Sequence, residues 1–320
     1  MDDIIYAIEI VAVDITPYRD GNTGIPYFTT FDSGVAGPHV MLTAVTHGNE
    51  LCGAIALDFL FREGVRPVRG KLSLGFVNHA AYHTFDADDP SASRFIDEDF
   101  NRTWGEDVLD GPRNTVETRR AREIRPIIDT VDYLLDIHSM QHKTVPLMMC
   151  GPLDKGRALA HALGAPVEVI SDAGHAAGKR LRDYTFFGDP NTPQNALLVE
   201  CGQHWETASV DVAKDSSLRF LRHFDVVSGD FIDQHLSATP PPQQRLIEVS
   251  GPVTIKTANF RFAETYTGLE TIEHAGTVIG WDDNEEIKTP YDNCVLIMPS
   301  RRLVPGQSAV RLGRLIDWPN

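Results

Sequence analysis

The chain has 320 residues, of which 42% are hydrophobic and 23% charged, and its net charge at pH 7 is −16. This length exceeds one typical domain, so we expect two. The acidic balance argues against nucleic acid and against anionic membrane surfaces as partners, because phosphate binding needs a basic surface. An acidic substrate would have to be held by local arginines inside a cleft.

Neither a membrane helix nor a secretion signal is predicted. No stretch of the sequence approaches the ~18 apolar residues that a membrane helix needs, and residues 1–4 are acidic where a signal peptide is basic. Cys52, Cys150, Cys201 and Cys294 lie far apart without CxxC spacing, which indicates free thiols in a reducing compartment. We therefore expect a cytoplasmic protein. The composition leaves open whether it forms a homo-oligomer.

Strands and helices alternate over the first two thirds of the chain. Apolar runs predict buried strands, and runs of helix-forming residues without proline predict helices. Asn114 with Glu117 can cap a helix that runs to about residue 128. The predicted strands are 40–45, 72–77, 133–138 and 195–200, and the further helices are 51–61, 155–163 and 207–224. This alternation to about residue 235 predicts an α/β layered domain with its site at the carboxyl ends of strands.

The alternating pattern of predicted strands and helices ends near three consecutive prolines, residues 240–242. Such a run is typical of a stiff linker or exposed loop. Short β-type runs follow at 245–249, 253–256, 277–281, 294–298 and 309–312. We therefore predict a catalytic α/β domain over residues 1–238 and a small β-rich domain over residues 245–320 that shapes the cleft.

His47, Glu50 and His138 are candidate metal ligands. The first two lie in a turn between a predicted strand and a predicted helix, and His138 ends another predicted strand. Two imidazoles and one carboxylate suit zinc and leave a tetrahedral position open for water. A zinc ion so held lowers the pKa of water and polarises a carbonyl, which is hydrolase chemistry. A His and a Glu three residues apart also occur as surface or helix pairs. Spacing alone leaves both interpretations open.

Four short sequence motifs, which follow one another along the chain, support the interpretation as a metal site. They are His47-Gly48-Asn49-Glu50, Asp99-Phe100-Asn101-Arg102, Asp136-Ile137-His138 and Val199-Glu200-Cys201-Gly202. Together they resemble the succinylglutamate desuccinylase/aspartoacylase family of the zinc carboxypeptidase fold group. The resemblance implies a zinc-carboxypeptidase-like mixed sheet flanked by helices, with a smaller C-terminal β domain.

The resemblance also implies site roles. It assigns one zinc ion per chain to His47, Glu50 and His138, and it makes Glu200 the general base. A carboxylate near an activated water can take its proton and then deliver it to the leaving amine.

The same resemblance implies substrate binding by Arg94, Asn101 and Arg102, since a guanidinium grips a carboxylate through two parallel hydrogen bonds. Arg94 would also help to stabilise the tetrahedral oxyanion. Asp97 and Asp99 are expected to orient these cations.

Several other residues are weaker candidates. Asp136, two residues before His138, is either a hydrogen-bond partner of that histidine or a ligand of a second metal. His204, four residues after Glu200, would line the pocket.

Tyr184, Tyr266 and Tyr291 could each offer a phenol, but no motif selects among them. Two departures from the family stand out. His79 replaces a common proline, and residues 188–193 lack the additional substrate-gripping arginine of the best-known members.

These observations predict a cytoplasmic zinc amidohydrolase that removes an acyl group from an N-acylated amino acid or a related small amine. One alternative is a metallocarboxypeptidase acting on short peptides. A second is a catalytically silent small-molecule binding protein that keeps the fold. The acyl group and the amine cannot be identified from the sequence.

Overall fold

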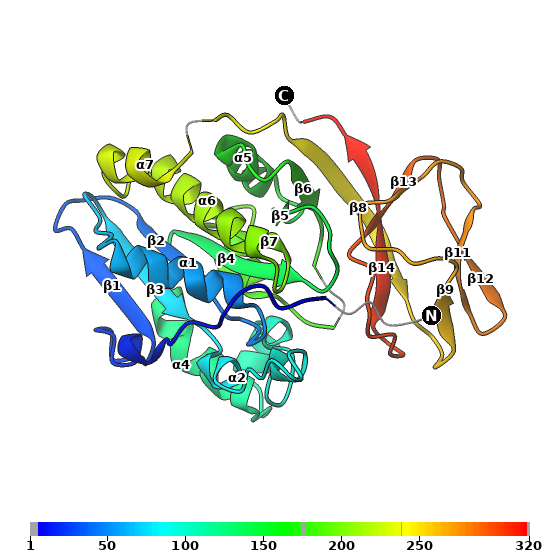
Figure 1. The fold of residues 1–320 in the computed structure, drawn as a ribbon, viewed down its shortest axis with the longest axis horizontal. Helices are drawn as coiled ribbons and strands as arrows, with labels where there is room; N and C mark the ends of the chain where they lie inside the picture. The colour runs from blue at the N-terminus through cyan, green and yellow to red at the C-terminus, as the bar shows by residue number, and fades with distance from the viewer. Residues whose placement is uncertain (1–5, 175–176, 238, 319–320) are drawn as a thin grey trace.

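The computed structural model describes residues 6–174, 177–237 and 239–318. Within them, one mixed sheet of eleven strands carries helices on both faces, and a separate three-stranded sheet is built from strands within residues 260–288 (Figure 1). This confirms the predicted fold class. The expected domain boundary at residue 238 and the acidic residues 1–4 lie outside the described residues, so the division into two domains stays a prediction.

Four parallel strands form the centre of the main sheet. Strand β2 (His39–Ala44) pairs with β3 (Lys71–Phe76) and with β4 (Tyr133–Met140), and β4 pairs in turn with β7 (Asn195–Gln203). These strands are almost entirely buried. Parallel strands covered on both faces need continuous apolar runs, which is why the sequence predicts these four directly.

Successive side chains of β2 point to opposite faces of the sheet and enter different parts of the core. Leu42 joins the cluster formed with the helices of one face, whereas Met41 packs against the other face. The first face carries α1 (Leu51–Arg62), α5 (Asp154–Leu163), α6 (Thr207–His223) and α7 (Gly229–His235), and the second carries α4 (Val116–Ile128).

The cap predicted for α4 was wrong. Thr115, not Asn114, is the N-cap, and its side chain accepts a hydrogen bond from the main-chain N–H of Thr118. Thr115 thereby satisfies a free N–H group of the first turn, as any short hydroxyl side chain at this place can. Thr118, not Glu117, completes this cap.

Several short elements were not predicted, because they carry only a few apolar residues each. They are the strands β1 (Phe28–Asp32), β5 (Leu147–Met149), β6 (Glu168–Ser171), β9 (Phe260–Phe262), β10 (Thr271–Ile272) and β12 (Glu285–Lys288), and the helices α2 (His79–Tyr82), α3 (Glu106–Leu109) and α7.

The C-terminal strands continue the main sheet. Strand β8 (Arg245–Thr254) pairs in parallel with β6 and in antiparallel with β14 (Ser308–Ile316). Residues 245–249 and 253–256, predicted as two strands, therefore lie mostly in one long strand. The remaining strands are β13 (Cys294–Ile297) and β10 (Thr271–Ile272) in the main sheet, and β9 (Phe260–Phe262), β11 (Val278–Asp282) and β12 (Glu285–Lys288) in the small one.

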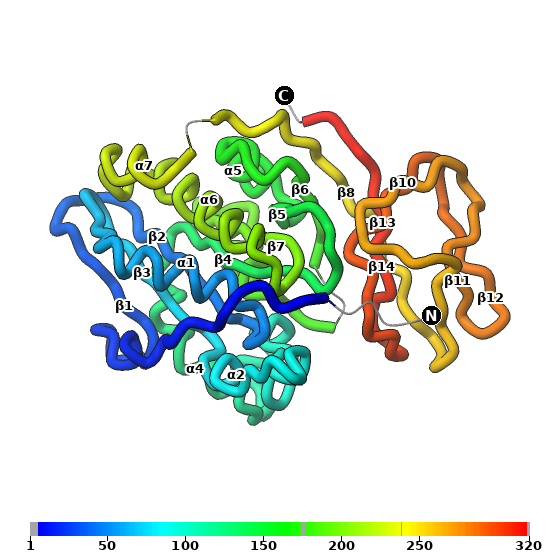
Figure 2. The backbone as a smooth tube through the Cα atoms, in the orientation of Figure 1, coloured from blue at the N-terminus to red at the C-terminus, as the bar shows by residue number. Residues whose placement is uncertain are grey.

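The proline-containing segment joins the two regions through specific contacts. Figure 2 shows the chain after α7 passing α5 on its way to β8. The side chain of Gln244 donates to the main-chain oxygens of Ala160 and Pro166, and its own main-chain oxygen accepts from the Trp318 indole. Among the described residues, no helix has the length and hydropathy needed to cross a membrane.

Candidate active site

A cavity of about 540 Å³ opens at the carboxyl ends of the central parallel strands. Its walls come from these strand ends, from the loop around residues 94–102, and from the C-terminal residues 254–311. The residues predicted as metal ligands, base, substrate-binding groups and pocket histidine all line it: His47, Glu50, Arg94, Asn101, Arg102, His138, Glu200 and His204. The structure therefore brings together residues spread over more than 150 positions of sequence.

His47 and Glu50 lie in the turn between β2 and α1. His47 Nδ1 and Glu50 Oε1 are 2.7 Å apart. The turn packs tightly against its neighbours, because a Cβ at Gly48 would lie only 2.3 Å from main-chain atoms of Ala81 and Ser93. Only glycine permits this approach, which explains why the residue directly after His47 is a glycine.

His138 lies near the end of β4 and faces the same carboxylate. Its Nδ1 is 2.9 Å from Glu50 Oε2, and its Nε2 is 2.7 Å from Asp136 Oδ2. The hydroxyls of Thr43 and Thr46 donate to the other oxygen of Asp136. Asp136 thus makes the hydrogen bond expected of a residue that orients His138.

The three side chains could hold a metal ion. One ligand atom from each of His47, Glu50 and His138 can be chosen so that all lie within 4.8 Å of one another, and all three residues are buried. Burial alone would raise the pKa of Glu50, yet His47 and His138 hold it well below its usual range. Burial likewise opposes the charging of His138, but Asp136 and Glu50 raise its pKa well above the ordinary value. The carboxylate therefore attracts a cation, which is a proton or a metal.

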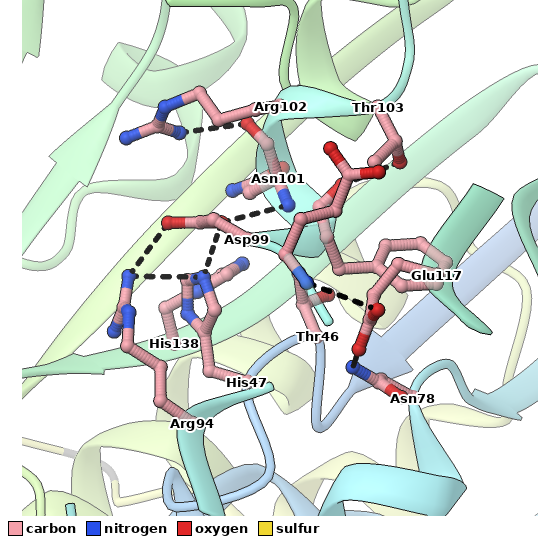
Figure 3. Close-up of polar contacts among 12 residues, drawn as sticks. Thr46, His47, Asn78, Arg94, Asp99, Asn101, Arg102, Thr103, Glu117 and His138 are labelled. Carbon is pink, nitrogen blue, oxygen red and sulfur yellow. Dashed lines mark hydrogen bonds and ion pairs between the residues drawn. The ribbon is translucent and has the colours of Figure 1, made fainter. Parts of the chain in front are cut away.

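Arg94 and Asp99 adjoin this group. Arg94 Nη1 is 3.4 Å from Glu50 Oε1, and Arg94 Nη2 is 3.3 Å from Asp99 Oδ2. The other oxygen of Asp99 lies 2.9 Å from His47 Nε2, and Figure 3 shows Arg94, Asp99 and His47 in this arrangement. Asp99 thus contacts Arg94, one of the two arginines that it was expected to orient, but forms no ion pair with Arg102 among the described residues. The expectation for Asp97 was wrong, because its carboxylate accepts a hydrogen bond from the main-chain N–H of Val116 instead.

Asn101 and Arg102 extend the loop deeper into the cavity. The side-chain oxygen of Asn101 accepts from the main-chain N–H of Leu181, which leaves its amide nitrogen as the donating end. Arg102 Nη1 donates to the main-chain oxygen of Asn101. Burial lowers the pKa of Arg102 to about 10, although Asp99 opposes this.

One buried carboxylate anchors the loop that carries these cations. Glu117 of α4 accepts hydrogen bonds from the main-chain N–H groups of Ile96, Asp97 and Glu98, and from the side chain of Asn78. Figure 3 shows the Asn78 contact. Three successive N–H groups bound to one carboxylate fix the main-chain path between Arg94 and Asp99.

Glu200 lies on β7 beside His138 of β4 in the sheet register. It is buried, and its Oε2 has no hydrogen-bond partner among the described residues. Burial raises its pKa to about 8, against the opposing effect of His138 and with the support of Glu50. A carboxylate with a pKa near neutrality can both accept and release a proton under physiological conditions.

His204 lies against the same wall. Its Nδ1 is 2.9 Å from the Ser139 hydroxyl, and its Nε2 has no partner within the described part of the chain. Burial lowers its pKa to about 3, so the ring is neutral. Tyr184, Tyr266 and Tyr291 do not belong to the cavity lining.

Sequence analysis missed three arginines that line the cavity, Arg180, Arg302 and Arg311. Arg311 left a trace that could have identified it, because it is a charged residue within the apolar run 309–312. A charge in the middle of a buried strand is uncommon unless it is paired or functional.

Comparison with known proteins identifies a matching family. The family described as succinylglutamate desuccinylase/aspartoacylase catalytic domain matches residues 36–222, more than half of the chain. No curated protein matches the chain.

Solved structures show the same fold. A succinylglutamate desuccinylase/aspartoacylase from Rhodobacter sphaeroides is 21% identical with a TM-score of 0.64, over 92% of this chain and 89% of that one. A succinylglutamate desuccinylase from Vibrio cholerae is 16% identical with a TM-score of 0.66, over 92% and 89%. The product-bound ectoine utilization protein EutE (DoeB) from Ruegeria pomeroyi is 17% identical with a TM-score of 0.62, over 91% and 88%.

The Glu117 anchor yields a first prediction. Glu117→Ala leaves three loop N–H groups without their acceptor, so we expect a loss of about 1–3 kcal/mol in the free energy of unfolding and weaker substrate binding with unchanged metal content. Chemical denaturation and metal analysis measure these effects. Glu106→Ala, at an exposed acidic position on α3, is the control. Unaltered stability and an unaltered KM in the Glu117 variant would contradict the anchoring role.

Glu200 yields a pH prediction for metal-free protein. Its pKa is about 8 in the folded state against 4.5 as the ordinary value, so the folded state keeps a proton that the unfolded state releases. The contribution of Glu200 to stability is therefore complete below about pH 4.5 and is lost as the pH rises through 8. Glu200→Gln cannot lose that proton, so its stability relative to wild type should rise between pH 5 and pH 8. A pH-independent difference in unfolding free energy would disprove the shift.

Proposed function

Because the chain belongs to the succinylglutamate desuccinylase/aspartoacylase family, we propose that it is a zinc-dependent hydrolase that removes the acyl group from an N-acylated amino acid or a related small amine. The observation that carries the proposal is the single cavity that gathers the His47, Glu50 and His138 side chains, Glu200, and the arginine-bearing loop. The names of solved relatives, two of them succinylglutamate desuccinylases or aspartoacylases and one with its product bound, support a small-molecule substrate.

The donor set fits zinc. Two imidazole nitrogens and one carboxylate oxygen are common zinc ligands, and a set of three leaves room for a further ligand. Bound there, zinc would acidify a water molecule and polarise the scissile carbonyl. Asp136 and Asp99 hold the outer nitrogens of the two histidines, which fixes the direction in which their inner nitrogens point.

Glu200 serves as the general base and then as the general acid. Its unpartnered Oε2 can accept a proton from a water in the cavity as that water attacks the amide carbonyl. The protonated carboxyl can then deliver the proton to the departing nitrogen. A pKa near neutrality suits a group that must do both within one turnover.

The loop of residues 94–102 positions the substrate. Arg94 lies beside Glu50 and can place its positive charge near the oxygen that becomes negative in the transition state. Asn101 and Arg102 offer N–H donors to a substrate carboxylate. The C-terminal residues that line the cavity limit its volume to about 540 Å³, which suits a small N-acyl amino acid and excludes a long peptide.

A substrate panel tests the proposal. Acetyl, succinyl and formyl derivatives of acidic, basic and neutral amino acids would be offered to zinc-loaded protein, with dipeptides alongside. Hydrolysis of N-acyl amino acids in preference to dipeptides supports the deacylase. The opposite preference supports the metallocarboxypeptidase, and bound metal without any turnover supports a silent binding protein.

The metal assignment gives its own prediction. Purified protein should contain one zinc ion per chain, and His138→Ala should weaken zinc binding by more than the roughly 10- to 100-fold that the loss of an outer hydrogen-bond partner costs. His142→Ala is the matched control, because His142 also lines the cavity but contacts Tyr6 instead. Full zinc content in the His138 variant by elemental analysis would refute the ligand set.

The base assignment gives the sharpest prediction for turnover. Glu200→Gln keeps the shape but removes the proton acceptor, so kcat should fall by at least ~10²-fold. The variant should keep its zinc content and its affinity for a reaction product, because neither depends on Glu200. A variant that loses its zinc would make Glu200 a ligand, and near-normal turnover would exclude this mechanism.

A further inference from the structure

One wall of the cavity is apolar. Met140 of β4, Met149 of β5 and Leu198 of β7 line the cavity together with Met298, which follows β13. All four side chains belong to one apolar cluster, in which the first three are buried and Met298 is half-buried against them. We call these four residues the apolar wall. The groups assigned to the substrate carboxylate come instead from the loop of residues 94–102.

The apolar wall adjoins the residue assigned as general base. Leu198 lies two residues before Glu200 on β7, so both side chains point to the same face of the sheet, about 7 Å apart along the strand. Met149 of β5 pairs directly with Leu198 across the antiparallel ladder. A direct pair of this kind places the two Cβ atoms about 5 Å apart. A substrate whose scissile bond lies at Glu200 therefore has apolar surface beside it.

Met298 is held in the cavity lining from both of its ends. Its φ is 50°, in the left-handed region that residues with a Cβ rarely adopt. Such a conformation persists only where the surrounding structure enforces it. At the other end of the residue, Arg311 Nη1 donates to the Met298 sulfur at 3.8 Å. The main chain and the thioether are thus both fixed.

The chemistry of the apolar wall favours an apolar group of the substrate. An apolar chain that covers this wall removes both surfaces from water, which is favourable in proportion to the area covered. A carboxylate in the same place would lose its hydration without gaining a partner, because no side chain of the wall can donate a hydrogen bond. Methionine is unbranched and has three rotatable bonds, so the wall can adapt to chains of different length.

We propose that the apolar wall is a subsite for an alkyl chain of the substrate, and that it selects N-acylated amino acids with such a chain over those with a second carboxylate. This rests on the proposed hydrolase function and narrows its substrate class. The chain belongs either to the acyl group or to the amino-acid side chain, since both begin within two bonds of the scissile amide. The chemistry of recognition is the same for both, and the experiment separates them.

Two chain-length series identify the group that the wall binds. One series lengthens the acyl group of N-acylated alanine from acetyl to butanoyl to hexanoyl. The other lengthens the side chain of N-acetylated amino acids from alanine to norvaline to norleucine. With zinc-loaded wild type, kcat/KM should rise about 2- to 4-fold per methylene in one series, since full burial of a methylene is worth about 4-fold. A flat or falling response in both series would overturn the subsite.

Matched charged substrates test the exclusion of a second carboxylate. N-succinylalanine and N-acetylaspartate carry a carboxylate where N-butanoylalanine and N-acetyl-2-aminobutyrate carry a methyl group. In the series that responds to chain length, the charged member should be the poorer substrate by at least ~10-fold, because burial of an unpaired carboxylate is heavily penalised. A charged member hydrolysed as well as its apolar counterpart would overturn the proposed selectivity.

Substitution of Met298 tests the wall itself. Glutamine has nearly the length of methionine but is polar, so Met298→Gln should reduce the gain per methylene, whereas Met298→Leu should retain it. Leu269→Gln is the matched control, because Leu269 is also half-buried against the same cluster, also has a positive φ of 67°, and does not belong to the cavity lining.

The measured quantity is the ratio of kcat/KM between the longest and the shortest substrate of the responding series. A partial loss of folded protein leaves this ratio unchanged, so the ratio separates substrate selection from a structural effect. An unaltered ratio in Met298→Gln, or an equal reduction in Leu269→Gln, would overturn the role of Met298.

Binding keeps the subsite testable if no substrate is hydrolysed. Calorimetry would measure N-acetylalanine, N-hexanoylalanine and N-acetylnorleucine with zinc-loaded Glu200→Gln protein, with and without Met298→Gln. Tighter binding of one of the longer ligands, with a negative heat-capacity change that Met298→Gln diminishes, supports the subsite even if the hydrolase proposal fails. Equal affinity for all three ligands overturns the subsite and leaves the proposed hydrolase function to be judged by the panel alone.

Discussion

The carboxylate of Glu50 joins parts of the chain that are distant in sequence. One oxygen faces His47 at 2.7 Å, and the other faces His138 at 2.9 Å and accepts the main-chain N–H of Ser139 at 3.3 Å. A carboxylate this deeply buried persists only with partners, and removal of one partner of a buried pair typically costs about 3–5 kcal/mol. The end of β2, the start of α1 and the end of β4 are therefore held together at the point where a cation can bind.

The next layer of contacts makes that arrangement rigid. Asp136 binds the outer nitrogen of His138 and is itself held by two threonine hydroxyls, while Asp99 binds the outer nitrogen of His47. Each imidazole is thus fixed from both sides. A site held in this way needs little reorganisation when it binds a metal, and small reorganisation is what makes electrostatic stabilisation effective in catalysis. Glu117 extends the same principle to the substrate loop.

The parts of the fold that follow local rules were predictable from sequence. The four central strands are long apolar runs, and the carboxyl ends of parallel strands share one edge of a sheet, so His47, His138 and Glu200 were expected together. The short strand β5 has no such pattern, and its place beside β7 depends on distant pairing. The capping error had a different cause. Thr115 and Asn114 are both residue types that cap helices well, so the sequence does not choose between them. Glu117 was expected to complete the cap with Asn114, but it accepts hydrogen bonds from the loop of residues 96–98 instead.

Arg311 shows why part of the site was beyond the sequence. Its place in the cavity lining depends on β8 pairing with β6 and on β14 pairing with β8. None of these pairings is local. The pairings also have a physical consequence, because a cation on a strand in the middle of a hydrogen-bonded sheet is placed more rigidly than one on a loop. Arg102 is on a loop, but that loop is fixed to α4 through Glu117.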